Sequence, residues 1–125
     1  MKTISTANAP RPAGHYSQAV VCGGVVYVAG QLGGDPARPG TPAGGAGAQT
    51  MQAMANVAAV LEAAGSGLAN ILQSTIYITD IDLWGEVNEA YAEVMGGHRP
   101  ARAIVPIGPL RPGYLVEIQV IAALS

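Results

Sequence analysis

Two charged residues stand alone in apolar surroundings near the end of the chain, and their chemistry is complementary. Residues 99–118 read RPARAIVPIGPLRPGYLVEI, in which Arg102 and Glu117 each interrupt a short apolar run. Charges are scarce elsewhere, since the 125 residues include six Lys and Arg and eight Asp and Glu. A guanidinium in a pocket can bind a carboxylate through two hydrogen bonds, and a carboxylate beside it can deprotonate a water molecule. The pair therefore indicates either a site for a carboxylate-bearing substrate or a plain cross-strand salt bridge.

The proximity of these two charges depends on how the last two strands pair. If 101–107 and 114–124 form a hairpin around the loop PIGPLRPG, a register with Val105 opposite Tyr114 also places Arg102 opposite Glu117. Directly opposed residues have Cβ atoms about 4.5–5.5 Å apart and lie on one face of the sheet. We therefore expect the two charges to be neighbours within one chain.

The strands that must position these residues are rich in β-branched side chains. Residues 17–21 and 25–30 flank Gly23 and Gly24, a turn signal that predicts a hairpin. Residues 71–79 predict a third strand, and a short strand at 3–5 would precede the hairpin. The last strand is apolar on both faces toward its end, so one face can bury against helices and the other needs a second protein surface.

Two helices separate the strands. The spacing of Met54, Val57 and Leu61 predicts a helix over 49–64 that stops at Gly65. A second apolar stripe predicts a helix that Asp82 caps and Gly96-Gly97 ends. The order β-β-α-β-α-β-β indicates an α+β fold with one mixed sheet and both helices on one face.

Composition narrows the class of protein. The length suits one domain, residues 1–125, with 33–48 (GGDPARPGTPAGGAGA) as a loop inside it. Only 11% of the residues are charged, against roughly 25% in ordinary soluble domains, which suggests that self-association hides part of the surface. The net charge of −2 without a basic cluster argues against nucleic acid.

Cys22 is the only cysteine, so no intramolecular disulfide and no thiolate metal cluster can form. The first residues, MKTISTANAPRPAGHY, are polar and proline-rich where a signal peptide would be apolar, and no apolar stretch is long enough to span a membrane. We expect a cytoplasmic location.

Several segments in order resemble one known family. PARAIVPIGPLRPGYLVEI is similar to the C-terminal signature of the Rid family (reactive intermediate deaminase, also called the YjgF or L-PSP endoribonuclease family). Further segments that match the family in order are ISTANAP (4–10), GHYSQAVVCGGVVYVAGQL (14–32), QT (49–50), LEAAG (61–65) and VNEAY (87–91). The resemblance implies a chorismate-mutase-like fold, a homotrimer around a central β-barrel, and three clefts between subunits. It also implies hydrolysis of enamines and imines of the 2-aminoacrylate type to a 2-keto acid and ammonia, with no metal or organic cofactor.

The resemblance also assigns roles to single residues. Arg102 would hold the substrate carboxylate, and Glu117 would position the attacking water with the help of the backbone carbonyl of Ile104. Tyr16 would line the pocket, and the backbone at Gly30 would face the substrate nitrogen. Asn88 matches a recurrent position near the cleft, although a surface hydrogen bond on the second helix explains it equally well.

Some positions depart from the family pattern and keep rival functions open. Ile104 stands where many members have cysteine, and Arg99 where an aromatic residue often precedes the Pro-x-Arg motif. Arg99 and His98 near the cleft would recruit a substrate with a second acidic group. The alternatives are a relative dedicated to one pathway intermediate, such as an aminomuconate-type compound, and a non-catalytic carboxylate sensor. The roles of His15 and Trp84 stay undecided between function and packing.

Overall fold

The computed structural model describes residues 1–125 as one mixed six-stranded sheet with two helices. The strands are β1 (Lys2–Ile4), β2 (Ala19–Cys22), β3 (Val25–Leu32), β4 (Ile71–Ile78), β5 (Ala101–Pro106) and β6 (Val116–Ala123). The helices are α1 (Ala46–Ala63) and α2 (Trp84–Met95), and 3-10 turns occupy Leu68–Asn70 and Ile81–Leu83. The predicted order of elements and the α+β class are confirmed.

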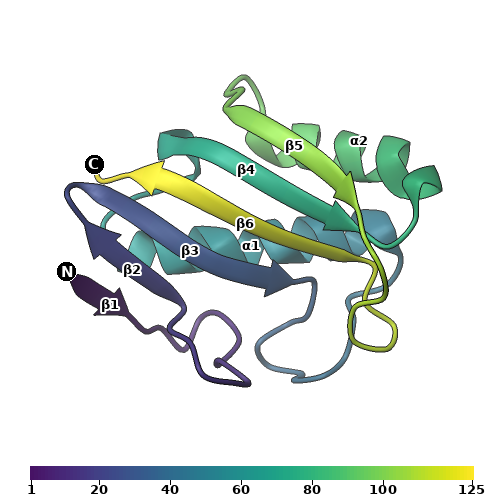
Figure 1. Ribbon diagram of the computed structural model, residues 1–125, viewed down its shortest axis with the longest axis horizontal. Coiled ribbons are helices and arrows are strands. Elements are labelled where there is room, and N and C mark those ends of the chain that lie inside the picture. The colour runs from purple at the N-terminus through teal and green to yellow at the C-terminus, as the bar shows by residue number, and fades with distance from the viewer.

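The strand order β1-β2-β3-β6-β4-β5 places the last strand in the middle of the sheet (Figure 1). β6 is antiparallel to both of its neighbours, β3 and β4, whereas β5 lies at the edge and pairs in parallel with β4. The predicted hairpin between the last two strands is therefore wrong. The hairpin of β2 and β3 is confirmed, with Cys22 opposite Val25.

The central place of β6 follows from its side chains. Val116, Ile118 and Val120 are buried and face the helices, and two neighbouring strands satisfy the hydrogen bonds of both of its edges. β5 has mostly exposed residues and ends in Pro106, features that suit an edge strand. The connection from β5 to β6 thus crosses over β4 instead of turning tightly.

Both helices cover the same face of the sheet, and the other face carries no helix (Figure 1). We call these the helix face and the open face. On the helix face, Ile76 and Ile118 are fully buried together with Val57 and Leu61 of α1. On the open face, Tyr27 is half exposed. None of the helices is long and apolar enough to cross a membrane.

The ends of the helices follow the sequence signals in part. Gly65 and Gly96 adopt φ values of 84° and 61°, so glycine suits both helix ends as expected. α1 begins three residues earlier than predicted, and its Gly47 N–H donates to the carboxylate of Glu86 on α2 at 2.6 Å. Asp82 does not cap α2. Instead, Asp80 accepts a hydrogen bond from the Asp82 N–H and caps the 3-10 turn before the helix.

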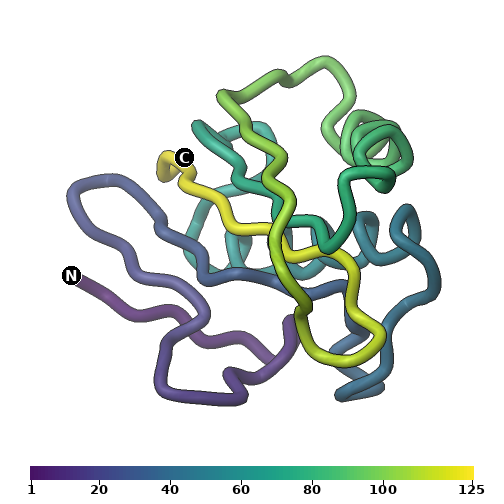
Figure 2. Tube along the Cα trace, turned by 45° about the vertical axis from the view of Figure 1, so that its right-hand side comes forward, coloured from purple at the N-terminus to yellow at the C-terminus, as the bar shows by residue number.

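Three loops gather at one end of the sheet, namely 5–18, 33–45 and 107–115 (Figures 1 and 2). Two buried glutamines hold them. The Gln18 side chain accepts from the Thr6 N–H and donates to the carbonyls of Thr6 and Pro10. The Gln49 side chain donates to the carbonyls of Gly44 and Gly113 and accepts from the Leu115 N–H. The backbone of these loops is therefore fixed, although it forms little regular structure.

Candidate active site

A cleft of about 910 Å³ opens where the three loops meet the ends of β3 and β6. Its lining includes Glu117, Gly30 and Tyr16, three of the residues that the resemblance singled out. Tyr16 is half exposed at the rim, and its hydroxyl accepts a hydrogen bond from the Ala13 N–H at 3.3 Å. The cleft thus unites residues from the 5–18 loop, β3 and β6.

A β-bulge brings the backbone of β3 against the Glu117 side chain. The pairing of β3 with β6 shifts register between Val28 and Gln31, so that Ala29 and Gly30 together lie opposite one residue of β6. A Cβ built on Gly30 would lie 2.9 Å from the carboxyl carbon of Glu117, closer than real Cβ contacts. A side chain at position 30 would therefore displace the Glu117 carboxyl group from this place.

Burial at this position changes the acidity of Glu117. It raises the pKa of the carboxyl above its ordinary value, because the charged form loses hydration. No neighbouring cation of the same chain opposes this effect. A carboxyl group with a raised pKa in a cleft is a candidate for general acid–base catalysis.

Arg102 lies in a second cluster, between β5 and α2. Its Nη1 donates to Oδ1 of Asn88 at 2.7 Å. Its guanidinium carbon lies 5.7 Å from the ring centroid of Trp84 and 5.3 Å from that of Tyr91, both within the range of cation–π attraction. The Arg102 side chain is exposed, so the edge of the guanidinium that Asn88 leaves free is open to a carboxylate. Asn88 therefore holds Arg102 through an exposed hydrogen bond on α2, and it does not line the cleft.

The cluster has a buried hydrogen bond beneath it. The Tyr91 hydroxyl lies 2.8 Å from Oγ of Ser74, the residue opposite Arg102 on β4. Burial raises the pKa of Tyr91, while the bond to Ser74 and the charge of Arg102 act in the opposite direction. The aromatic ring is thus held in place under the guanidinium. Ile104 lies two residues further along β5, is half-buried and packs against the core.

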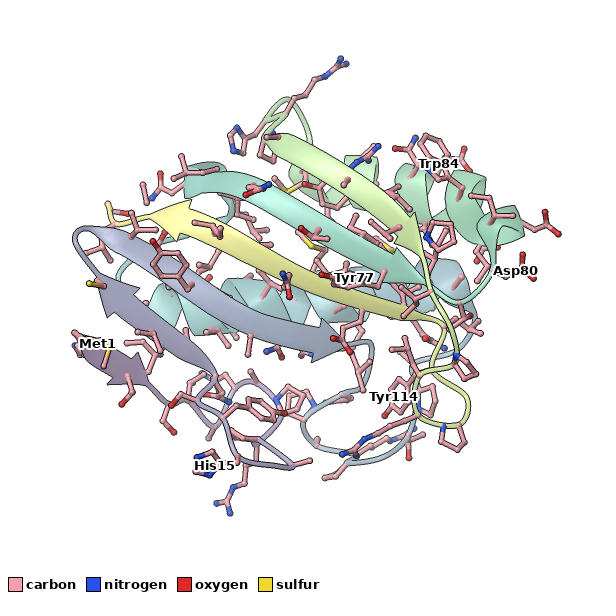
Figure 3. All side chains as sticks on the ribbon, in the orientation of Figure 1. Met1, His15, Tyr77, Asp80, Trp84 and Tyr114 are labelled. Carbon is pink, nitrogen blue, oxygen red and sulfur yellow. The ribbon has the colours of Figure 1, made fainter.

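Arg102 and Glu117 are not neighbours within the chain, contrary to the expected register. Glu117 pairs with Tyr77 and Leu32, whereas Arg102 pairs with Ser74. Glu117 alternates with the buried Val116 and Ile118 and so points to the open face, whereas Arg102 contacts α2 on the helix face. Figure 3 shows Trp84, which contacts Arg102, at the upper right of the molecule and Tyr114, which lines the cleft, at the lower right. One chain therefore carries two separate half-sites.

The structure also places the residues whose roles the sequence left open. The imidazole Nε2 of His98 lies 2.8 Å from the Ile71 carbonyl at the start of β4, and neither His98 nor Arg99 lines the cleft. Trp84 belongs to the Arg102 cluster. The sequence did contain a signal that Trp84 belongs with Asn88 and Tyr91, because residues 84, 88 and 91 share one face of a helix. No three His, Cys, Asp or Glu side chains lie together as a metal ion would require.

Comparisons with known proteins identify the family of this chain. The family model described as Endoribonuclease L-PSP matches residues 6–124. A RutC family protein of Pyrococcus horikoshii is 40% identical over 121 residues, which cover 97% of this chain and 96% of that protein. The rat 2-iminobutanoate/2-iminopropanoate deaminase is also 40% identical over 121 residues, covering 97% of this chain and 88% of the rat protein.

Solved structures share the fold along its whole length. The crystal structure of Escherichia coli TdcF with bound serine superimposes with a TM-score of 0.93 at 31% identity, and the match covers 100% of both chains. The six-stranded sheet with two helices on one face is therefore an arrangement that this relative shares.

Proposed function

Since the chain belongs to the Endoribonuclease L-PSP family, the Rid family that its sequence resembles, we propose that it hydrolyses reactive imines and enamines to 2-keto acids and ammonia. The observation that carries the proposal is the Glu117 carboxyl, desolvated and packed on the Gly30 backbone inside the cleft. The rat relative named as a 2-iminobutanoate/2-iminopropanoate deaminase supports the same reaction. TdcF, solved with serine, supports a small carboxylate-bearing ligand.

The reaction needs few groups because an imine carbon is already electrophilic. Glu117 takes a proton from a water molecule, and the water oxygen bonds to the imine carbon. Glu117 returns this proton to the imine nitrogen, which gives a carbinolamine. The hydroxyl proton of the carbinolamine then passes through Glu117 to the nitrogen, the C–N bond breaks with its electron pair going to the nitrogen, and ammonia leaves as the C=O bond forms. General acid–base help of this kind contributes about 10²–10⁴-fold, and holding the substrate carboxylate on Arg102 supplies orientation.

We further propose that each working site combines the Glu117 half of one copy with the Arg102 half of another. The two groups lie on opposite faces of one sheet, so a single chain has no evident way to apply both to a small substrate. Arg102 sits on the edge strand β5 with its guanidinium exposed, which makes it accessible to a neighbour. A homotrimer, in which three such clefts close around one axis, meets this requirement.

Imine hydrolysis is tested by coupling the protein to a pyridoxal-phosphate dehydratase. The dehydratase acts on threonine or serine, and the release of keto acid is followed with and without the protein. We expect acceleration above spontaneous hydrolysis, with both Arg102→Ala and Glu117→Gln at least about a hundredfold slower. Tight binding of a keto acid without acceleration would point instead to a carboxylate-binding module.

The shared site is tested by mixing the two inactive variants. When Arg102→Ala and Glu117→Gln chains are refolded together, mixed trimers contain one site with both native residues. We expect on the order of a quarter of the wild-type rate, although each variant alone is inactive. Mixed trimers as inactive as the separate variants would show that both groups must come from one chain.

A further inference from the structure

The cleft is larger than the small imines named for the relatives require. Its volume of about 910 Å³ lies in the range of pockets for drug-sized ligands, and 2-iminobutanoate is far smaller. Part of the cleft therefore has room for a substrate group beyond the reacting carbon and its carboxylate.

The cleft also contains two cations that the proposed hydrolysis does not use. Arg11 from the 5–18 loop and Arg111 from the 107–115 loop line it from different segments. The two acidic residues of the lining do not neutralise them. Asp35 accepts a hydrogen bond from the Ala37 N–H in its own turn, and Glu117 has a raised pKa without any cation effect.

Both arginines stand on loops whose backbone is held by a buried side chain. Gln18, 2% exposed, binds the carbonyl of Pro10 directly before Arg11. Gln49, fully buried, binds Gly113 and Leu115, which follow Arg111. The Tyr114 N–H closes the turn onto the Arg111 carbonyl at 2.9 Å. The backbone that carries each of the two arginines is therefore fixed at the cleft.

We infer that Arg11 and Arg111 form a subsite for a second carboxylate, so that the preferred substrates are imines of acidic amino acids. This inference rests on the proposed hydrolysis and names its substrate class. The imine of aspartate or glutamate would place its α-carboxylate on the Arg102 of a second copy and its side-chain carboxylate on the two cleft arginines. Guanidinium groups bind carboxylates through paired, charge-assisted hydrogen bonds. Arg99 does not line the cleft of its own chain, and it is not part of this subsite.

The test compares two imines generated in place by amino-acid oxidases. One is 2-iminobutanoate and the other is iminosuccinate, from aspartate. For both, the accelerated loss of imine over spontaneous hydrolysis gives kcat/KM. We expect the ratio of kcat/KM, diacid over monoacid, to fall about tenfold or more in Arg111→Gln and in Arg11→Gln. Arg38→Gln is the matched control, since Arg38 does not line the cleft, and we expect it to keep the wild-type ratio.

A second measurement does not require turnover. Calorimetric binding of oxaloacetate and of 2-oxobutanoate, the two products, should show the same loss of preference in the cleft variants. If the wild type hydrolyses 2-iminobutanoate but neither arginine changes the ratio or the binding preference, the subsite is wrong and the proposed function stands. If the folded wild type accelerates the hydrolysis of neither imine, the proposed function is wrong, and imines of acidic amino acids are then not substrates either.

Discussion

Burial of the Glu117 side chain costs the folded chain stability and at the same time makes its carboxyl group more reactive. The folded chain binds the Glu117 proton more tightly than the unfolded chain does, because burial raises the pKa of this carboxyl. The stability that this group contributes is full below about pH 4 and is lost as the pH rises through the folded-state pKa. An uncharged replacement of similar shape should not suffer this loss.

We therefore predict that Glu117→Gln raises the melting temperature at pH 7 by a few degrees and leaves it unchanged near pH 4. The comparison is made in an Arg102→Ala background, because the Arg102 of a second copy would favour the charged carboxylate. Thermal unfolding followed by circular dichroism gives both values. The same gain at both pH values, or a loss at pH 7, would show that desolvation does not govern this carboxyl.

Trp84 offers a second prediction at the scale of a residue. Its ring and that of Tyr91 flank the Arg102 guanidinium, and a partly exposed cation–π contact contributes about 0.5–1 kcal/mol. We expect Trp84→Leu to raise KM roughly two- to fivefold with little change in kcat, because the guanidinium binds the substrate and does not move protons. Trp84→Phe keeps an aromatic face and should recover most of the loss. A fall in kcat at constant KM, or equal effects of Leu and Phe, would assign Trp84 to packing.

At the scale of elements, Gln49 connects the first helix to the loops that shape the cleft. Gln49→Leu keeps the volume similar but leaves two carbonyls and the Leu115 N–H without partners in a buried place. Buried polar groups left without partners cost about 1–3 kcal/mol each, and partial relaxation makes a total of about 2–4 kcal/mol the expected loss. Urea unfolding measures it. Gln52→Leu removes one hydrogen bond, to Asn56, and should lose about 1 kcal/mol or less. Equal losses of unfolding free energy in the two variants would show that Gln49 contributes no more to stability than Gln52.

The elements also show which parts of the fold the sequence could predict. Helix and strand segments follow from local periodicity, so the predicted order agrees with the structure, and Gly65 and Gly96 end the helices as expected. The pairing of β6 does not follow from local signals, because its partners β3 and β4 lie far away in the sequence. Adjacent strands pair often, and the assumption that β5 and β6 do so produced the wrong neighbour for Glu117.

The candidate site, like the fold, could be predicted from the sequence only in part. Of the residues carried over from the family resemblance, Glu117, Gly30 and Tyr16 line the cleft, and Arg102 and Asn88 bind each other. Ile104 packs against the core instead. The division into two half-sites was not predictable, because it depends on which face of the sheet each side chain takes. The aromatic partners of Arg102 come from a helix on a different segment, so no spacing around Arg102 could indicate them.

At the scale of the whole molecule, the number of positive charges distinguishes the ribonuclease activity in the family's description from the proposed imine hydrolysis. A ribonuclease needs clustered cations along a phosphate backbone, whereas this chain has six Lys and Arg and a net charge of −2. Its arginines are few and separate, with Arg102 held against α2 and two arginines at the cleft. This distribution favours small anionic substrates over RNA.

The open face of the sheet carries the last prediction, which concerns assembly. Tyr27 is 49% exposed on β3, opposite the half-buried Ile121 of β6, and such an apolar face suits contact with further copies. Tyr27→Lys would bring like charges together around the proposed threefold axis at little cost to the single chain, because the side chain is already half exposed. We expect sedimentation equilibrium to show dissociation at micromolar concentration, together with loss of imine hydrolysis. Met51→Lys, at a 40% exposed position on α1, is the matched control and should stay assembled and active. If both variants stay assembled, the copies do not meet through this face, and Arg102 must reach its neighbour's cleft by another arrangement.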